Sequence, residues 1–173
     1  MAKRQSLREF QQELTRRLTE VKLSGRRSAL LAVNAGTENW LLDLAEAGEI
    51  IATPTITPVP QTRPWFRGLA NVRGNLYSVV DFAAFCGEAQ TPLTSEARIL
   101  LIGTKHGMNT ALLVNRAVGL RNPEDFDADD QADTREWVSG AVRDSQDRLW
   151  RKLSVRPLLV DAHFLDAALE THV

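Results

Sequence analysis

Short runs of Val, Ile and Leu, separated by Gly, Asn, Pro or charged residues, dominate the chain from Ser28 onward. Runs of this length are typical of strands and too short for an average helix. Many short strands at close spacing favour an antiparallel sandwich or small barrels. The sequence therefore predicts a mainly β fold, with strands within 28–34, 39–44, 48–52, 76–82, 97–103, 109–115, 116–120 and 148–154.

Three segments depart from this pattern and are predicted to be helical. Pro64 opens the segment 64–71, which we expect to form a helical turn. A short helix should follow Asp81 and end at Gly87, because glycine is common just after a helix. Residues 156–169 have the apolar content of a terminal helix opened by Pro157.

The first 27 residues differ from the rest in both periodicity and charge. Ser6 and Glu9 have the spacing of a capping box, and we predict an amphipathic basic helix over 1–27. Eight Lys/Arg against three Glu give this segment a net charge of +5, which leaves −6 for the other residues of a chain whose total is −1. The helix either docks on its own body or is an arm that binds a partner. Its apolar stripe consists of Leu7, Phe10, Leu14, Leu18 and Val21.

The stretch FRGLANVRGNLYSVVDF, residues 66–82, combines two glycines, an arginine and a strand-like run. We expect Gly74 to adopt a positive φ before the strand and Gly68 to permit close packing. Arg73 would then lie at a rigid edge, where its planar guanidinium suits a partner's carboxylate or carbonyl groups. An ion pair with Glu49 or Asp81 inside the chain is the alternative, and the two roles are compatible.

This stretch resembles the CheW-like adaptor domain of bacterial chemosensory systems. The proline-bearing loop before it and the segments 45–51 and 111–120 are similar to further parts of that family, so the resemblance covers residues 28–170. The basic segment at the start favours the pilus-type branch, which serves twitching motility. The positions that match the family's central pattern are Phe66, Gly68, Leu69, Asn71, Val72, Arg73, Gly74, Val80, Asp81 and Phe82.

The resemblance implies two intertwined, five-stranded SH3-like barrels that share a core over residues 28–173, with short connecting helices and a C-terminal helix. It implies a non-catalytic adaptor in chemotaxis or type IV pilus signalling, which couples the cytoplasmic tip of a methyl-accepting chemoreceptor to the regulatory domain of a chemotaxis-type histidine kinase. It places structural roles at Gly68, Asn71, Gly74 and Asp81. It places partner contacts at Glu49, Ile50, Leu69, Arg73, Leu113 and Val118.

The residue chemistry separately argues against an enzyme. None of His106, His163 and His172 has ligand or triad-like spacing with Cys86, and there is no Gly-rich phosphate loop or nucleophile elbow. We therefore expect no catalytic residue, no cofactor and no metal site. The acidic run 125–136 matches an EF-hand loop at four positions but lacks its glycine, and we interpret it as a solvated loop.

Two other functions stay open. A small β-barrel could bind nucleic acid through the basic segment, although such barrels use exposed aromatics and Tyr77 is the only tyrosine here. A detached regulatory module of a kinase would share the adaptor's fold. The single cysteine, Cys86, fits a reducing compartment, and no stretch is apolar enough to insert into a membrane. We expect a cytoplasmic protein that reaches membrane receptor arrays through its partners and does not bind nucleic acid.

Overall fold

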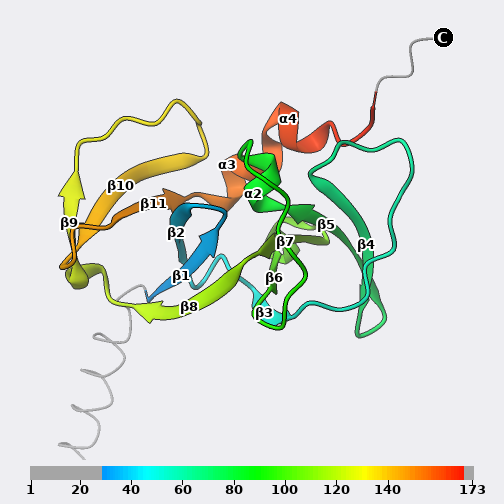
Figure 1. Cartoon of the computed structure of the whole chain (residues 1–173), viewed down its shortest axis with the longest axis horizontal. Coiled ribbons are helices and arrows are strands. Elements are labelled where there is room, and N and C mark those ends of the chain that lie inside the picture. The colour runs from blue at the N-terminus through cyan, green and yellow to red at the C-terminus, as the bar shows by residue number, and fades with distance from the viewer. Residues whose placement is uncertain (1–28, 170–173) are drawn as a thin grey trace, which may run out of the picture.

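The computed structural model describes residues 29–169, which form two β-sheets connected by short helices (Figure 1). The six-stranded sheet has the order β8-β1-β2-β11-β10-β9, and the five-stranded sheet has the order β3-β6-β7-β5-β4. The first sheet comprises β1 Leu30–Ala35, β2 Glu38–Asp43, β8 Arg116–Arg121, β9 Phe126–Asp129, β10 Val138–Asp144 and β11 Leu149–Leu153. The second comprises β3 Glu49–Ala52, β4 Phe66–Val72, β5 Asn75–Asp81, β6 Arg98–Ile102 and β7 Thr110–Val114.

The path of the chain interleaves the two sheets. The first two and the last four strands build the six-stranded sheet, and the five strands between them build the other sheet. Neighbouring strands are antiparallel except for two parallel pairs, β2 with β11 and β5 with β7. The predicted mainly β, two-lobed architecture is confirmed, although one sheet has six strands rather than the expected five.

Three hydrophobic clusters explain why the strands read as continuous apolar runs. A central cluster joins both sheets and includes Trp40, Val80 and Leu112. A second cluster lies within the five-stranded lobe around Val79, and a third lies within the six-stranded lobe around Trp150. Because successive side chains of a strand point to opposite faces, a strand between two clusters is buried on both sides.

The predicted helical turn at 64–71 is wrong, because residues 66–72 form strand β4, which pairs with β5. Pro64 stands before this strand and not at the start of a helix. Gly68 marks a β-bulge, where the register of the β4–β5 pair shifts. At this bulge the extended segment before β4 crosses the strand, and Thr57 exchanges two backbone hydrogen bonds of 2.8 and 2.9 Å with Leu69.

The other helices are short. The predicted helix after Asp81 is confirmed as α2, Phe82–Phe85, and it is followed by Gly87 with a φ of 89°. The single terminal helix expected within 156–169 is instead two helices, α3 Val155–Val160 and α4 Ala162–Leu165, which meet at Asp161. The extended backbone of Asp161 breaks the helix, and its side chain accepts a hydrogen bond from the Phe164 N–H. Two 3₁₀ helices, η1 Thr104–His106 and η2 Pro123–Asp125, complete the connections.

Sequence patterns missed two strands of the six-stranded sheet. The segment 125–136, taken as a solvated acidic loop, contains β9, and β10 follows it. The predicted helix over 1–27 lies outside the described residues. No helix within 29–169 combines the length and the apolar character needed to cross a membrane.

Candidate docking surface

The hairpin between β4 and β5 presents Arg73 on a two-residue turn. Val72 pairs with Asn75, so Arg73 and Gly74 are the two central residues, and both have positive φ, 52° and 86°. Two-residue hairpins favour this geometry because it matches the twist of the flanking strands. The side-chain oxygen of Asn71 accepts a hydrogen bond of 2.9 Å from the Gly74 N–H. The positive φ predicted for Gly74 is confirmed, and the hydrogen bond to Asn71 stabilises the turn.

Arg73 makes a two-pronged ion pair with Glu49, the first residue of β3. Its two terminal nitrogens lie 2.8 and 2.5 Å from the two carboxylate oxygens. The side chains remain 71% and 40% exposed, respectively. The hydrogen bond and the charge of Glu49 raise the pKa of Arg73 above its ordinary value. Because β3 and β4 are the end strands of the five-stranded sheet, the pair links the two ends of that sheet.

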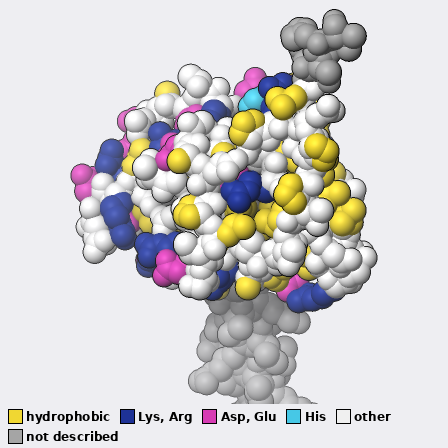
Figure 2. Space-filling model, turned by 45° about the vertical axis from the view of Figure 1, so that its right-hand side comes forward, with side chains coloured by type: hydrophobic (Ala, Val, Ile, Leu, Met, Phe, Trp, Pro, Cys, Tyr) yellow, Lys and Arg dark blue, Asp and Glu magenta, His cyan; other side chains and the backbone are white. Residues whose placement is uncertain are grey.

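Two apolar side chains on the strands of this hairpin reach the surface. Leu76, two residues after the turn, is 56% exposed, and Leu69 on β4 is partly exposed. Figure 2 shows hydrophobic side chains gathered on the half of the molecule that carries the five-stranded sheet, and charged side chains gathered mainly on the other half. Leu76 was not singled out from the sequence. The signal in the sequence was its position next to Tyr77, because side chains alternate along a strand and Tyr77 is buried.

The remaining predicted contact residues do not gather at this pair. Ile50 follows Glu49 on β3 but packs against the central cluster. Leu113 is 0% exposed inside the five-stranded lobe. It therefore cannot contact a partner in this conformation and is not part of this surface. Val118 lies on β8 of the other sheet and packs against the third cluster. The candidate docking surface therefore consists of Glu49, Leu69, Arg73 and Leu76.

A second group of charges lies in the six-stranded lobe and was missed by sequence reasoning. Arg135 lies 5.0 Å from the ring centroids of both Trp40 and Trp137. Its guanidinium donates to Asp133 at 2.6 Å and to Glu38 at 3.3 Å. The hydrogen bond to Asp133 is the main cause that raises the pKa of Arg135, and the bond to Glu38 adds to it. The hydrogen bond from Arg135 holds the pKa of Asp133 below its usual range. Because the charges satisfy one another, we assign them a structural role.

An open hollow of about 370 Å³ borders this group and is lined in part by Cys86. Burial is the main reason that the pKa of the Cys86 thiol rises to about 12, although the nearby Arg135 acts in the opposite direction. A thiol with such a pKa is protonated at neutral pH and is a poor nucleophile. His163 stacks on Phe85, with ring centroids 5.2 Å apart, and so packs as an aromatic residue. Residues 29–169 contain no group of three or more potential metal ligands.

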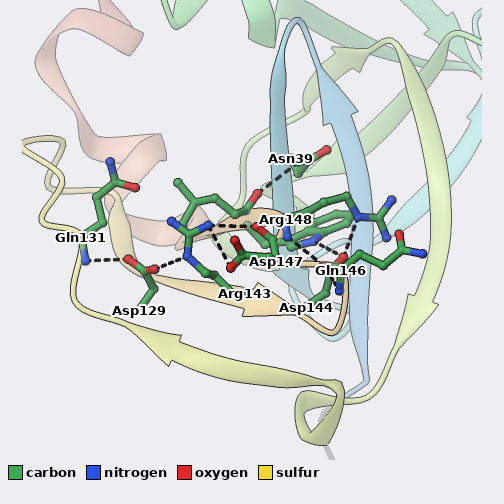
Figure 3. A network of polar contacts seen from close by, with 10 residues as sticks. Asn39, Asp129, Gln131, Arg143, Asp144, Gln146, Asp147 and Arg148 are labelled. Carbon is green, nitrogen blue, oxygen red and sulfur yellow. Dashed lines mark hydrogen bonds and ion pairs between the residues drawn. The ribbon is translucent and has the colours of Figure 1, made fainter.

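The hairpin between β10 and β11 carries a third polar network (Figure 3). Asp144 accepts hydrogen bonds from the backbone N–H groups of Gln146 and Arg148, at 2.9 and 3.0 Å. Its other oxygen accepts from the Arg148 side chain at 2.8 Å and from the Trp150 indole at 3.0 Å. Burial acts against the charged carboxylate, but these hydrogen bonds outweigh it and lower the pKa of Asp144 to about 2. The carboxylate thus fixes the shape of the turn.

Comparisons with known proteins agree with this arrangement. The family model of the CheW-like domain matches residues 29–163. Protein PilI of Pseudomonas aeruginosa is 27% identical over 139 residues, which cover 77% of this chain and 76% of that protein. The crystal structure of the scaffolding protein TtCheW from Thermoanaerobacter tengcongensis matches with a TM-score of 0.62 and 18% identity, and covers 73% of this chain and 88% of that one. At this identity the structural match establishes the fold alone. The family expected from the sequence is confirmed, and the chain belongs to the CheW-like domain family.

Proposed function

We propose that this protein is a non-catalytic adaptor that couples the cytoplasmic tip of a methyl-accepting chemoreceptor to the regulatory domain of a chemotaxis-type histidine kinase. Its family supports the class of function, and its likeness to PilI supports a pilus pathway that controls twitching motility. The adaptor works in the cytoplasm and is held at membrane receptor arrays by its partners. Its mechanism is positional, because binding two proteins at once raises their effective concentration and fixes their geometry.

The exposed Glu49–Arg73 pair is the observation that supports a docking role for this surface. Glu49 engages two of the five N–H donors of Arg73, which leaves donors for carbonyl or carboxylate groups of a partner. The two-residue turn holds the arginine in place, so little conformational entropy is lost when a partner binds. Leu69 and Leu76 supply apolar area on the same hairpin, and arginine is among the residues enriched at binding hot spots.

Calorimetric titration of the kinase regulatory domain into the wild-type adaptor and its variants tests this proposal. We expect Arg73→Ala to weaken binding by about 10- to 100-fold, the size of a lost charge-assisted contact, with little change in thermal stability. Leu76→Ala should weaken binding as well. Arg156→Ala is the matched control, because Arg156 is exposed on α3 and makes no ion pair within residues 29–169.

Two results would contradict the proposal in different ways. If Arg73→Ala binds the kinase normally but melts at a much lower temperature, the ion pair serves only the adaptor's own fold. If the wild-type protein does not bind the kinase but binds single-stranded DNA in a salt-dependent manner, the nucleic-acid alternative is correct.

A further inference from the structure

The negative charge of the body is concentrated in one short segment. Residues 122–136 contain seven Asp or Glu and one Arg, a net charge of −6. The residues from 28 to the end also sum to −6, so the rest of the body is neutral. The excess charge thus lies on η2, on β9 and on the connection to β10.

Part of this charge is balanced within the body and part is not. Asp129 pairs with Arg143 at 2.6 Å, and Asp133 pairs with Arg135 and Arg151. Asp127 on β9 and Asp130 after it are exposed, and neither forms an ion pair with another residue of the range 29–169. A cation from elsewhere could approach these two carboxylates.

Apolar side chains lie beside the acidic segment. Leu120 on β8 is 61% exposed. Leu30, Val118 and Phe126 are only partly buried and form the rim of the third hydrophobic cluster. Both β8 and β9 are end strands of the six-stranded sheet, so each has a backbone edge without a neighbouring strand of that sheet. Leu120 is opposite Leu31 in the β1–β8 ladder, so it points to the other side of the sheet from Leu30, which packs on the third cluster. We call the edge region that includes Leu30, Val118, Leu120, Phe126, Asp127 and Asp130 the β8–β9 face.

The start of the chain enters the body at this face. Leu30 pairs with Arg121 across the β1–β8 ladder, so the residues before Leu30 are tethered next to the point where the acidic segment begins. They comprise a segment of net charge +5 with an apolar stripe. A tether of a few residues gives this segment a high effective concentration at the face.

We propose that residues 1–27 dock in cis on the β8–β9 face, with the apolar stripe on Leu120 and the rim of the third cluster, and with the basic residues near Asp127 and Asp130. Exposed ion pairs are individually weak and are screened by salt, so the docked state depends on several contacts together and on ionic strength. In the docked state the segment covers the open edges of β8 and β9.

Paramagnetic relaxation enhancement on the full chain tests this proposal. A nitroxide is attached to a Gln12→Cys variant, whose new residue lies off the apolar stripe, and Cys86 is replaced by Ser so that only the new thiol reacts. At about 50 mM NaCl the backbone amide signals of residues 118–130 should lose most of their intensity, and they should recover at about 500 mM NaCl. Asp127→Lys should remove most of the effect at low salt. Glu96→Lys, the same charge change at an exposed position before β6, should leave it intact.

A mixture of nitroxide-labelled, unenriched protein with unlabelled, ¹⁵N-enriched protein tests for contacts between copies. Broadening of residues 118–130 in this mixture would mean that the segment docks on a second copy, which overturns docking in cis. Broadening centred on another surface, broadening that Asp127→Lys leaves unchanged, or no broadening at all would also overturn the proposal. These outcomes do not depend on kinase binding, so none of them contradicts the proposed adaptor function, which the calorimetric titration tests separately.

Discussion

The carboxylate of Asp81 and the guanidinium of Arg67 form an ion pair, with Oδ2 and Nη1 3.0 Å apart, in which the aspartate is completely buried. Asp81 ends β5 and also accepts hydrogen bonds from the backbone N–H and the hydroxyl of Thr91, at 2.7 and 2.8 Å, and from the Ala84 N–H at 3.2 Å. One side chain therefore caps α2, fixes the loop after it and balances an arginine of β4. The structural role expected of Asp81 is internal, and this carboxylate pairs with Arg67 rather than Arg73.

Replacing Asp81 by Ala should destabilise the fold by about 3 kcal/mol, because it leaves a largely buried guanidinium and several buried N–H and O–H donors without their acceptor. Glu96→Ala, at an exposed position, should change stability by less than about 0.5 kcal/mol. Urea denaturation of both variants measures the two effects. Equal stabilities would show that the Asp81 interactions contribute nothing net to folding.

Gly74→Val should destabilise the protein by about 1–3 kcal/mol, because a β-branched residue is strained at a positive φ. A Cβ at Gly74 meets no atom within 4 Å, so the cost comes mainly from the backbone conformation and not from a clash. Gly74→Asn is the matched variant, since asparagine tolerates the left-handed region, and it should lose less than half as much. Thermal and urea melts distinguish the two, and an equal loss in both would refute the backbone explanation.

Gly68→Ala should be more harmful than an alanine at another glycine of similar φ. A Cβ at Gly68 would lie 2.0 Å from the Thr57 carbonyl oxygen, whereas a Cβ at Gly119 meets nothing within 4 Å. The φ values of the two glycines are similar, 126° and 132°, so the backbone strain of an alanine should be about equal at both positions. Only Gly68 has the additional clash. We expect Gly68→Ala to cost at least about 2 kcal/mol more than Gly119→Ala in chemical denaturation. A smaller cost at Gly68 would mean that the crossing segment moves aside.

Asp144 should make stability depend on pH in the acid range. Its pKa of about 2 in the folded protein lies below the ordinary value of 3.8, so its contribution is fully present above about pH 4 and is lost as the pH falls toward 2. Asp144→Asn should therefore be less stable than the wild type at neutral pH, and the difference should shrink below pH 4. Urea melts between about pH 2 and 7 measure this difference. A constant difference across that range would show that the charge of Asp144 has no part in it.

The pattern of burial explains which elements the sequence predicts well. Val79 and Val80 are neighbours on β5 and belong to different clusters, so the strand appears in the sequence as a continuous apolar run. By contrast, β9 has the sequence Phe-Asp-Ala-Asp, which lacks this signal and reads as a loop. The segment of β4 was misread because Pro64 indicated a helix start, and because the bulge at Gly68 interrupts the alternation of the strand.

Local chemistry predicted part of the docking surface, and contacts between distant residues determine the rest. The Asn71-Arg73-Gly74 turn could be predicted because a positive φ and a side-chain hydrogen bond depend on adjacent residues. The pair with Glu49 was anticipated as one alternative. The packing of Arg135 between Trp40 and Trp137 joins residues from β2 and from the connection before β10. No local sequence pattern indicates a contact between residues so far apart in the chain.

The interleaved order of strands also has a consequence for how the chain folds during synthesis. All five strands of the β3–β7 sheet lie within residues 49–114, so this sheet can assemble as soon as β7 leaves the ribosome. The parallel partner of β2 is β11, where Arg151 pairs with Trp40, and β11 is the last of the described strands to be synthesised. Pairing between such distant segments closes a long loop and is slow. During that interval the inward faces of β1 and β2 lack half of their sheet, which makes the period before residue 153 emerges the one in which the nascent chain is most exposed to aggregation.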